Sequence, residues 1–298
     1  MRILTTINSN TNNGKPVRPT VIFGATGMLG SMFVRALPEA LFFSGAQADL
    51  TKKGAVEKIL ETYHPGVVIN CAAYTDVDGA EEHEDVANKV NGEGVRALAA
   101  AAKKIGARLV HFSTDYIFDG QNAHGYAEDA QPKPLNAYGR SKLAGEQAVQ
   151  EETDNYLLIR TAWLYGPNGK NFVDTMRKKM ESGEALRVVG DQEGSPTYTS
   201  DLVDATLLLL AKAAPSGIYH LVNSGRVSWF GFAQKIQALL GTHAPLEEVF
   251  SDAFPRPAQR PQYSVLNNTK LKNIKINPLP EWEDALARYL TKVVGGRL

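Results

Sequence analysis

The 298-residue sequence has no excess of charge, almost no cysteine and no long apolar run. Its 32 basic residues balance its 32 acidic residues, which argues against the basic surface typical of nucleic-acid-binding proteins. Cys71 is the single cysteine, so neither an intrachain disulfide nor a cysteine-based zinc site is possible. No apolar stretch reaches the roughly 20 residues that a membrane helix needs, and no signal-peptide core is present. We therefore expect a cytoplasmic protein that binds neither nucleic acid nor membrane.

The composition changes after the first residues of the chain. Residues 1–19 are rich in Asn and Thr and contain Gly14 and prolines, which predicts a flexible N-terminal arm. Over residues 20–170, short apolar segments alternate with helical patterns, and this alternation predicts an α/β fold with a doubly wound parallel sheet of the Rossmann type. The less regular residues 171–298 predict a smaller C-terminal substrate-binding domain. Within them, a segment near 197–222 is expected to return to the first domain.

A glycine-rich turn follows the first predicted strand. Residues 20–23 are apolar or β-branched, and Gly24, Gly27 and Gly30 then recur at every third residue as a helical pattern begins. In this context the first two glycines let the backbone approach a pyrophosphate, and the third lets the helix pack closely on the sheet. The helix N-terminus presents free N–H groups to the anion. The pattern predicts that residues 20–170 form a dinucleotide-binding domain; an ordinary glycine turn is the alternative.

The second predicted strand bears on the choice of cofactor. It covers residues 41–43 and is followed by Ser44 rather than by an acidic residue. An acid here would bind the ribose 2′-hydroxyl of NAD, so its absence leaves room for a 2′-phosphate, with Ser44 or Arg35 as candidate contacts. NADPH is therefore favoured, and NADH stays possible. Asp49 precedes a helix predicted over residues 51–63, where it either accepts a hydrogen bond from the adenine amine or caps the helix.

Two further predicted strands end in residues suited to a binding site. Residues 67–73 form an apolar run with small side chains at its carboxyl end, where a flat cofactor could lie against the backbone. A helix predicted over residues 83–104 leads to the next strand, residues 108–115, which ends in hydroxyls and a carboxylate. Ser113 or Thr114 could donate a hydrogen bond to a developing oxyanion. The same residue types also commonly close strands and begin turns.

Tyr138 and Lys142 lie in a helical pattern that follows a proline-containing loop. Their spacing places them one turn apart on one face, roughly 5–6 Å apart at the Cβ atoms. A phenol has a pKa near ~10, and an adjacent ammonium lowers that pKa, so the pair predicts an acid/base unit for a carbonyl or alcohol. A solvated helix face is the alternative. Trp163, just past a strand predicted from residue 156, could stack on a sugar or base, or could fill the core.

In combination, these segments resemble a known family. The cofactor turn, the Ser/Thr strand end and Tyr-x-x-x-Lys occur in the order typical of extended short-chain dehydrogenases/reductases. Within that family, residues 113–120, 160–166, 191–197 and 260–266 resemble the dTDP-4-dehydrorhamnose reductases. The resemblance runs from Thr20 to the C-terminal helix. It implies NAD(P)H-dependent reduction of the C4 keto group of dTDP-4-dehydro-β-L-rhamnose to dTDP-L-rhamnose, and it suggests a homodimer.

The resemblance also implies roles for individual residues. Tyr138 would donate the proton, Lys142 would hold the nicotinamide ribose and lower the tyrosine pKa, and Thr114 would polarise the C4 carbonyl. Substrate contacts would come from Thr114, Asp115, Trp163, Asn171 and Arg260. Cofactor contacts would come from Gly24, Thr26, Gly27, Met28, Leu29, Gly30, Asp49, Leu50, Ala72, Ala73, Tyr74 and Thr75, together with Tyr138 and Lys142. Some members of the family bind a divalent metal at a dimer contact, but the sequence has no ligand cluster of distinctive spacing, and no metal is expected.

Two alternative functions remain at this point. The chain could be a reductase or epimerase of another nucleotide-sugar, because the pocket residues, and not Tyr138 or Lys142, would select the sugar. It could also be a non-catalytic subunit that binds NADP and a partner enzyme. An intact set of Thr114, Tyr138 and Lys142 argues against the second alternative.

Overall fold

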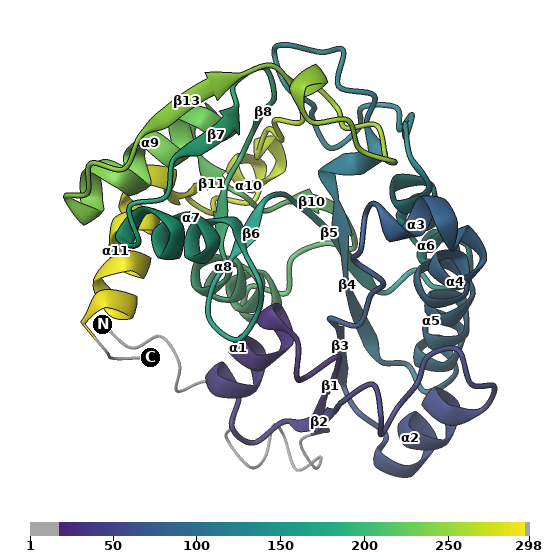
Figure 1. The fold of residues 1–298 in the computed structure, drawn as a ribbon. Coiled ribbons are helices and arrows are strands. Elements are labelled where there is room, and N and C mark those ends of the chain that lie inside the picture. Colours follow the sequence, from purple (N-terminus) through teal and green to yellow (C-terminus); the bar gives the residue numbers. More distant parts are fainter. Residues whose placement is uncertain (1–17, 296–298) are drawn as a thin grey trace.

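The computed structural model describes residues 18–295, and Figure 1 shows their arrangement. A six-stranded sheet lies at the centre, and every neighbouring pair of its strands is parallel. In spatial order its strands are β10 (Gly217–His220), β5 (Tyr156–Thr161), β4 (Arg108–Thr114), β3 (Val67–Asn70), β1 (Thr20–Phe23) and β2 (Leu41–Phe43). The doubly wound parallel sheet predicted from the sequence is confirmed.

The strand order changes direction beside β1. From β1 the chain passes to β2 on one side, then returns to β3 on the other side and continues through β4 and β5 to β10. In open sheets of this kind, ligands bind at the carboxyl ends of the strands, where the order reverses. The glycine turn after β1 and the ends of β3 and β4 lie at this edge. The topology therefore gathers the sequence-predicted site residues there.

Helices cover both faces of the sheet, which explains why most residues of its strands are apolar and buried. On one face, α2 (Ala55–Tyr63), α5 (Gly94–Lys104) and α6 (Ala137–Glu152) bury Val56, Leu98 and Val149 against the sheet. On the other face, α1 (Met28–Ala36) and α8 (Thr199–Ala211) bury Phe33 and Leu202. In Figure 1 the first group lies to the right of the sheet and the second to its left.

The later part of the chain has a third hydrophobic core. It lies among α7 (Phe172–Glu181), α9 (Trp229–Leu240), α11 (Trp282–Val294) and the paired strands β7 (Leu186–Val189) and β13 (Leu246–Val249). The remaining elements are short: α3 (Gly79–Glu82), α4 (Glu84–Asn88), β6 (Leu164–Tyr165), β8 (Glu193–Gly194), β9 (Thr197–Tyr198), β11 (Asn223–Ser224), β12 (Val227–Ser228), α10 (Thr269–Asn273), β14 (Leu279–Glu281) and the 3-10 turns Asp115–Ile117 and Ser251–Ala253. Although α8 and β10 come late in the sequence, they pack on or pair with the main sheet. The predicted boundaries of two functional domains stay a prediction.

Two predicted helices differ from the structure. Helix α2 begins at Ala55 and not at residue 51, because Gly54 has a left-handed φ of +80° that the helix cannot include. The helix predicted over residues 83–104 is broken by a π-helical turn at Lys89–Glu93. That wider turn contains Asn91, whose side chain binds neighbouring segments at the site.

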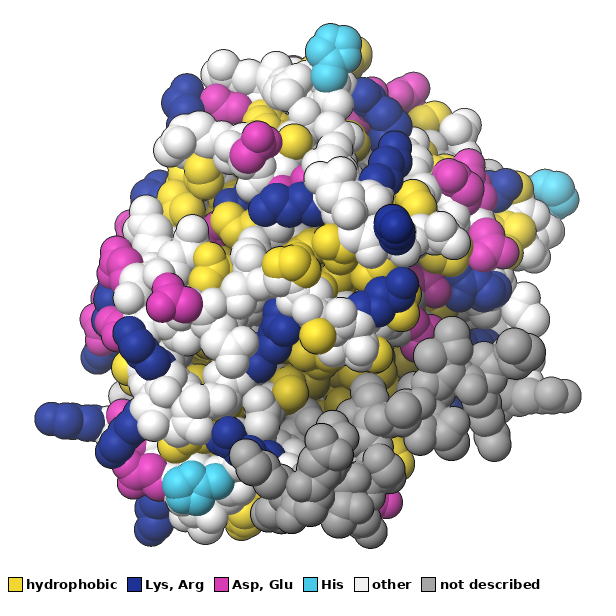
Figure 2. Space-filling model, turned by 180° about the vertical axis from the view of Figure 1, so that it is seen from behind, with side chains coloured by type: hydrophobic (Ala, Val, Ile, Leu, Met, Phe, Trp, Pro, Cys, Tyr) yellow, Lys and Arg dark blue, Asp and Glu magenta, His cyan; other side chains and the backbone are white. Residues whose placement is uncertain are grey.

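The N-terminal arm predicted over residues 1–19 lies outside the described residues except at its end. Arg18 donates hydrogen bonds to the carbonyls of His64, Pro65 and Ile105, so the chain is already fixed to the sheet's helices and loops at this point. Among the described residues no helix is long and apolar enough to cross a membrane. Figure 2 shows basic and acidic side chains scattered over one face, with hydrophobic side chains near its middle.

Candidate active site

The glycine turn after β1 is closed by backbone contacts that exclude side chains. Gly24 has a φ of +72°, and a Cβ on it would lie 2.5 Å from the backbone nitrogen of Ala72. A Cβ on Gly30 would lie 2.1 Å from the Gly24 carbonyl oxygen. Gly27 has room for a Cβ, but it is the N-cap of α1 and offers no side-chain cap. The first N–H groups of α1 therefore remain open to an anion, and the turn fits the pyrophosphate of a dinucleotide.

The predicted cofactor strip at the end of β3 is held by the π-helical turn. The Asn91 carboxamide accepts from Tyr74 N at 2.9 Å and donates to Tyr74 O at 3.0 Å. The same carboxamide donates to Ser141 Oγ on α6 at 2.9 Å. Ala72, Ala73, Tyr74 and Thr75 thus follow the sheet edge directly and are tied to the helix that carries Tyr138.

The residues predicted to contact the adenosine part of the cofactor do not all lie at one place. Asp49 accepts from Thr51 N and Oγ1, which lowers the pKa of Asp49 and makes it part of a local turn, not a cap of α2. Ser44 donates to Gln47 at the end of β2. Arg35 instead lines a separate cavity of about 200 Å³ with residues of α8 and α11. Of the two candidate 2′-phosphate contacts, Ser44 alone lies at the end of β2.

Thr114 and Tyr138 meet where β4 ends and α6 begins. Asn136 caps α6 by accepting from Gly139 N at 2.7 Å, which fixes the turn that presents Tyr138. Burial raises the pKa of Tyr138 to about 12, and a hydrogen bond with Thr114 limits that rise. Thr114 Oγ1 also donates to Asp115 Oδ1 at 3.0 Å. The structure therefore brings a protonated phenol, a hydroxyl and a carboxyl group together.

Lys142 follows Tyr138 by one helical turn but points to the backbone. Its Nζ donates to the Phe112 carbonyl at 2.6 Å, and its side chain is buried. Burial lowers the pKa of Lys142 to about 8, while the Glu146 carboxylate opposes that change. Lys142 is not among the groups that shift the pKa of Tyr138, so the predicted lowering of the tyrosine pKa is not found. The reason is that burial of the phenol outweighs the other influences.

Asp115 and its neighbours are buried polar groups at the same edge. Burial raises the pKa of Asp115 to about 6, so its carboxyl titrates within reach of neutral pH. Ser113 Oγ and Thr161 Oγ1, at the ends of β4 and β5, are buried without a hydrogen-bond partner in the described part of the chain. Buried polar atoms without partners are uncommon in folded proteins. Their position supports a ligand site at this edge.

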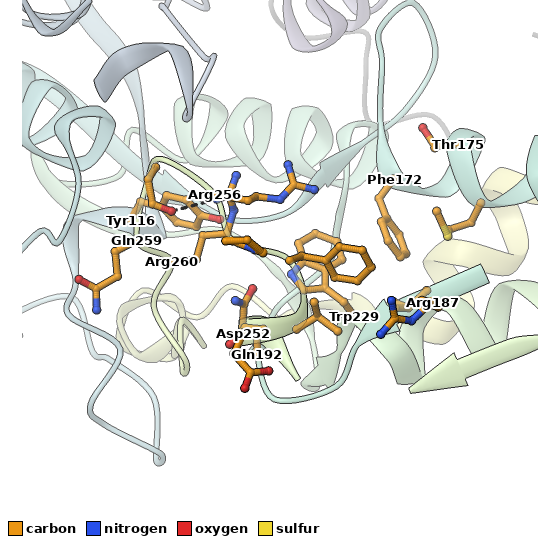
Figure 3. Close-up of a pocket in the computed structure, with 17 residues that line it drawn as sticks. Tyr116, Phe172, Thr175, Arg187, Gln192, Trp229, Asp252, Arg256, Gln259 and Arg260 are labelled. Atoms are coloured by element: carbon orange, nitrogen blue, oxygen red, sulfur yellow. Dashed lines mark hydrogen bonds between the residues drawn. The ribbon is translucent and has the colours of Figure 1, made fainter. Parts of the chain in front are cut away.

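A cavity of about 720 Å³ extends from this edge between the sheet and the third core. Tyr116 lies at one end, and its ring is 6.0 Å from the Tyr138 ring between centroids. Figure 3 shows Arg256 and Arg260 near Tyr116, with Phe172 and Arg187 toward the other end. The full lining is Tyr116, Phe172, Thr175, Met176, Arg187, Val188, Val189, Gln192, Trp229, Ser251, Asp252, Phe254, Pro255, Arg256, Ala258, Gln259 and Arg260. Guanidinium groups and aromatic rings in one cavity suit an anionic ligand with a planar ring.

Comparison with known proteins agrees with this geometry. The family model described as RmlD substrate binding domain matches residues 18–294. The chain belongs to the RmlD family. It is 42% identical over 280 residues to dTDP-4-dehydrorhamnose reductase of Mycobacterium tuberculosis, covering 91% of each chain. It is 38% identical to dTDP-4-keto-6-deoxy-D-glucose reductase of Streptomyces niveus, covering 90% of this chain and 95% of that one. The predicted resemblance is confirmed.

A solved RmlD relative also supports the fold. The crystal structure of dTDP-4-dehydrorhamnose reductase from Bacillus anthracis in complex with NADP superposes with a TM-score of 0.90 at 38% identity. The match covers 93% of this chain and 99% of that chain. The sheet described above is therefore that of an RmlD oxidoreductase.

Of the residues predicted to bind substrate in this RmlD chain, some line the cavity and others do not. Arg260 lines it, whereas Trp163 and Asn171 do not. Trp163 stacks on Trp229 with centroids 3.4 Å apart and planes 6° apart, and Trp229 faces the cavity instead. Asn171 is the N-cap of α7 and donates to the Gly166 carbonyl, so its amide is engaged in the local fold. The expected direct roles of Trp163 and Asn171 therefore have no support in this arrangement.

Three cavity residues escaped the sequence analysis. Trp229 opens α9, and Arg187 lies on β7. Arg256 precedes Arg260 on the extended segment 254–261, which we call the arm. The Pro-Arg-Pro sequence at Arg256 marked an extended basic arm, but Arg187 and Trp229 carried no local signal. Among the described residues, no group of three or more His, Cys, Asp or Glu could hold a metal ion. Glu193 is paired with Arg226.

Proposed function

We propose that this oxidoreductase reduces the C4 keto group of dTDP-4-dehydro-β-L-rhamnose to give dTDP-L-rhamnose, using NADPH. The observation that carries the proposal is the course of the cavity. It begins among arginine and aromatic side chains and ends at Tyr116, beside the Thr114–Tyr138 pair. The glycine turn lies at the same edge of the sheet. A nucleotide-sugar lying along the cavity would thus bring its sugar to the phenol.

The residues of the chain supply the proton and hold the carbonyl. NADPH, when bound, supplies the hydride. When substrate binds, the Thr114 hydroxyl turns its single proton from Asp115 Oδ1 to the C4 oxygen and stabilises the charge that develops there. Tyr138 then protonates the alkoxide, which is a far stronger base than a phenolate. A pKa of about 12 suits this task, because the phenol keeps its proton until a strong base forms.

Lys142 and Asp115 support that transfer. The Lys142 ammonium lies one turn from Tyr138, where it can donate hydrogen bonds to the nicotinamide ribose. Asp115 accepts from Thr114 at 3.0 Å in this structure, and once the threonine proton has turned to the substrate, the carboxylate can accept from a sugar hydroxyl. Lys142 acts when protonated and Asp115 when ionised. Their pKa values of about 8 and about 6 leave a window near neutral pH in which both conditions hold.

Several features support NADPH over NADH. The turn at Gly24, Thr26, Gly27, Met28, Leu29 and Gly30 fits the pyrophosphate of either cofactor, but the residue after β2 is Ser44, not the acid that would bind the ribose 2′-hydroxyl of NAD. The Bacillus anthracis relative was crystallised with NADP. In this proposal Asp49 and Leu50 flank the adenine, and residues 72–75 line the nicotinamide half. The two-domain division and a cytoplasmic location are expectations from the sequence, and a homodimer is one from the family.

The cavity supports a nucleotide diphosphate linked to a sugar. The guanidinium groups of Arg187, Arg256 and Arg260 line the cavity and can donate hydrogen bonds to phosphate oxygens. Phe172 and Trp229 offer flat surfaces to a base. A second candidate is reduction of another dTDP-4-keto-sugar, which the Streptomyces niveus relative favours by its name. The two candidates share Tyr138 and differ in the sugar.

The direct test of the proton donor is Tyr138→Phe. We expect turnover to fall by about 10²–10⁴-fold, the usual contribution of a general acid, while NADPH binding changes little. Tyr126→Phe is the matched control, since Tyr126 is also a buried tyrosine but donates to Asp119. Its turnover should stay near that of the parent. Near-parental turnover of Tyr138→Phe would overturn the assignment of Tyr138.

A further inference from the structure

Asp78 joins two distant parts of the chain beside the cavity. It lies between the predicted cofactor strip and α3. Its carboxylate accepts from Arg260 Nη1 at 3.1 Å and from Arg260 Nη2 at 3.0 Å. It also accepts from Arg256 Nη1 and from the backbone N–H of Ala258, both at 3.3 Å. The Asp78 carboxylate thus accepts hydrogen bonds from two cavity arginines and from the backbone N–H of Ala258, which lies between them in the sequence.

The Asp78–Arg260 pair is mostly shielded from water. The Arg260 side chain is 19% exposed and that of Asp78 is 28% exposed, whereas Arg256 is 56% exposed. A guanidinium that is largely buried needs a partner, because an uncompensated buried charge is costly. The Asp78 carboxylate engages both terminal nitrogens of Arg260, which fixes the plane of the guanidinium. Arg260 therefore faces the cavity in one defined orientation.

The segment that carries Asp78 is itself fixed to the start of α6. Glu81 Oε1 on α3 accepts from Ala137 N at 2.7 Å. Asn136 Nδ2, beside it, donates to the Gln259 carbonyl of the arm at 2.7 Å. The arm, α3 and the turn before Tyr138 therefore form one hydrogen-bonded unit. Because the segment that carries Asp78 is fixed in this unit, we expect its carboxylate to stay bound to Arg260 when an anion binds. We call this support of Arg260 by Asp78 the brace.

We infer that Asp78 is a positioning residue for the substrate diphosphate, acting through Arg260 at the inner end of the cavity. This inference rests on the proposed function, because it takes a nucleoside diphosphate as the occupant. Asp78 does not touch the ligand itself. Asp78 holds Arg260 beside Tyr116. The distance between Arg260, which contacts the phosphate, and the Thr114–Tyr138 pair is therefore fixed. Without the Asp78 carboxylate, Arg260 becomes mobile. Diphosphate binding must then order the Arg260 side chain, and this reduces the net binding free energy.

The test compares dTDP and thymidine binding by calorimetry in Asp78→Asn. A carboxamide presents one acceptor and one donor to the guanidinium, so it cannot accept both Arg260 bonds. Because hydrogen bonds to charged groups contribute about 1.5–3 kcal/mol, we expect dTDP affinity to fall by about 10- to 100-fold. Thymidine lacks the diphosphate, and its affinity should be unchanged. In steady state, KM for the nucleotide-sugar should rise by a similar factor, with kcat and NADPH affinity unchanged.

Three further variants separate this role from others. Asp76→Asn is the matched control, since Asp76 lies two residues away and accepts from Gly79 N through one oxygen that the substitution retains. It should bind dTDP like the parent. In an Arg260→Ala background, Asp78→Asn should cause no further loss, because the two act as one unit. Asp78→Glu keeps the carboxylate and should restore part of the affinity, which also provides a variant if Asp78→Asn fails to fold.

The outcomes distinguish this inference from the proposed function. Unchanged or tighter dTDP binding in Asp78→Asn, an equal loss for thymidine, or a full additional loss in the Arg260→Ala background would each overturn the role of Asp78. Absence of turnover by the parent protein, with dTDP binding intact, would count against the proposed reaction alone. The calorimetric comparison would still decide the role of Asp78.

Discussion

Replacement of Glu146 by Gln tests how the catalytic helix is supported. Glu146 lies on α6 one turn after Lys142, and Arg160 on β5 binds it through Nε at 3.0 Å and Nη2 at 2.7 Å. Their side chains are 1% and 2% exposed. Arg160 also donates to the Glu128 carbonyl and lies over the Phe118 ring. The pair fixes α6, which carries Tyr138 and Lys142, to the sheet.

Glu146→Gln leaves the buried charge of Arg160 without a counterion and puts an amide donor against a guanidinium donor. Breaking a buried pair from one side costs about 3–5 kcal/mol. That loss is a large part of the ~5–15 kcal/mol by which a folded domain is stable. At roughly 2 °C per kcal/mol for a chain of this size, the Tm should fall by roughly 6–10 °C. Because Glu146 raises the pKa of Lys142, the alkaline loss of activity should also move to lower pH.

The assay combines urea unfolding with a pH–rate profile of NADPH oxidation. Glu151→Gln is the matched control, since Glu151 also lies on α6 and pairs with an arginine, Arg96, but is 60% exposed. That variant should lose less than about 1 kcal/mol and keep its pH profile. A loss in Glu146→Gln no larger than that of the control, or an unmoved alkaline limb, would refute the reasoning.

The remaining predictions concern the turn, the pH window and the cavity wall. Gly30→Ala places a methyl group 2.1 Å from the Gly24 carbonyl, so both NADPH affinity and stability should fall in a titration and a thermal melt. Activity should fall as the pH drops through about 6, because Asp115 gains a proton there. It should also fall as the pH rises through about 8, because Lys142 loses a proton there. A pH–rate profile that is flat from pH 5 to pH 9 would contradict both roles. Trp229→Ala removes an aromatic wall of the cavity and should weaken dTDP binding by about 10-fold or more, as calorimetry can measure, with NADPH affinity unchanged.

Local patterns in the sequence predicted the sheet and the helix that carries Tyr138 correctly. Residues 20–23 and the following glycines specify strand, turn and helix within a few residues, and backbone contacts at Gly30 confirm why no side chain fits there. Asn136 and the proline-containing loop likewise marked the start of α6. Such features need no distant contacts, so the sequence carries them directly.

The cavity wall could not be predicted in the same way. Trp229, Arg187 and Arg256 come from separate elements and meet through packing of the third core. From the sequence, Trp163 could either stack on a ligand or fill the core, and its stacking partner proves to be Trp229, which lies 66 residues later in the sequence. The pKa of Tyr138 also depends on burial, and Tyr138 packs against Ala80 and Ala87 from an earlier part of the chain. Each of these properties is tertiary and leaves no periodic or local signal.

The most direct test of the central claim is NADPH oxidation with dTDP-4-dehydro-β-L-rhamnose, generated in place from dTDP-glucose by a dehydratase and an epimerase. The account predicts rapid, substrate-dependent loss of NADPH absorbance with dTDP-L-rhamnose as the product. UDP- and GDP-linked 4-keto-sugars should react far more slowly. A protein that binds NADPH but oxidises none with this substrate would contradict the proposed reaction.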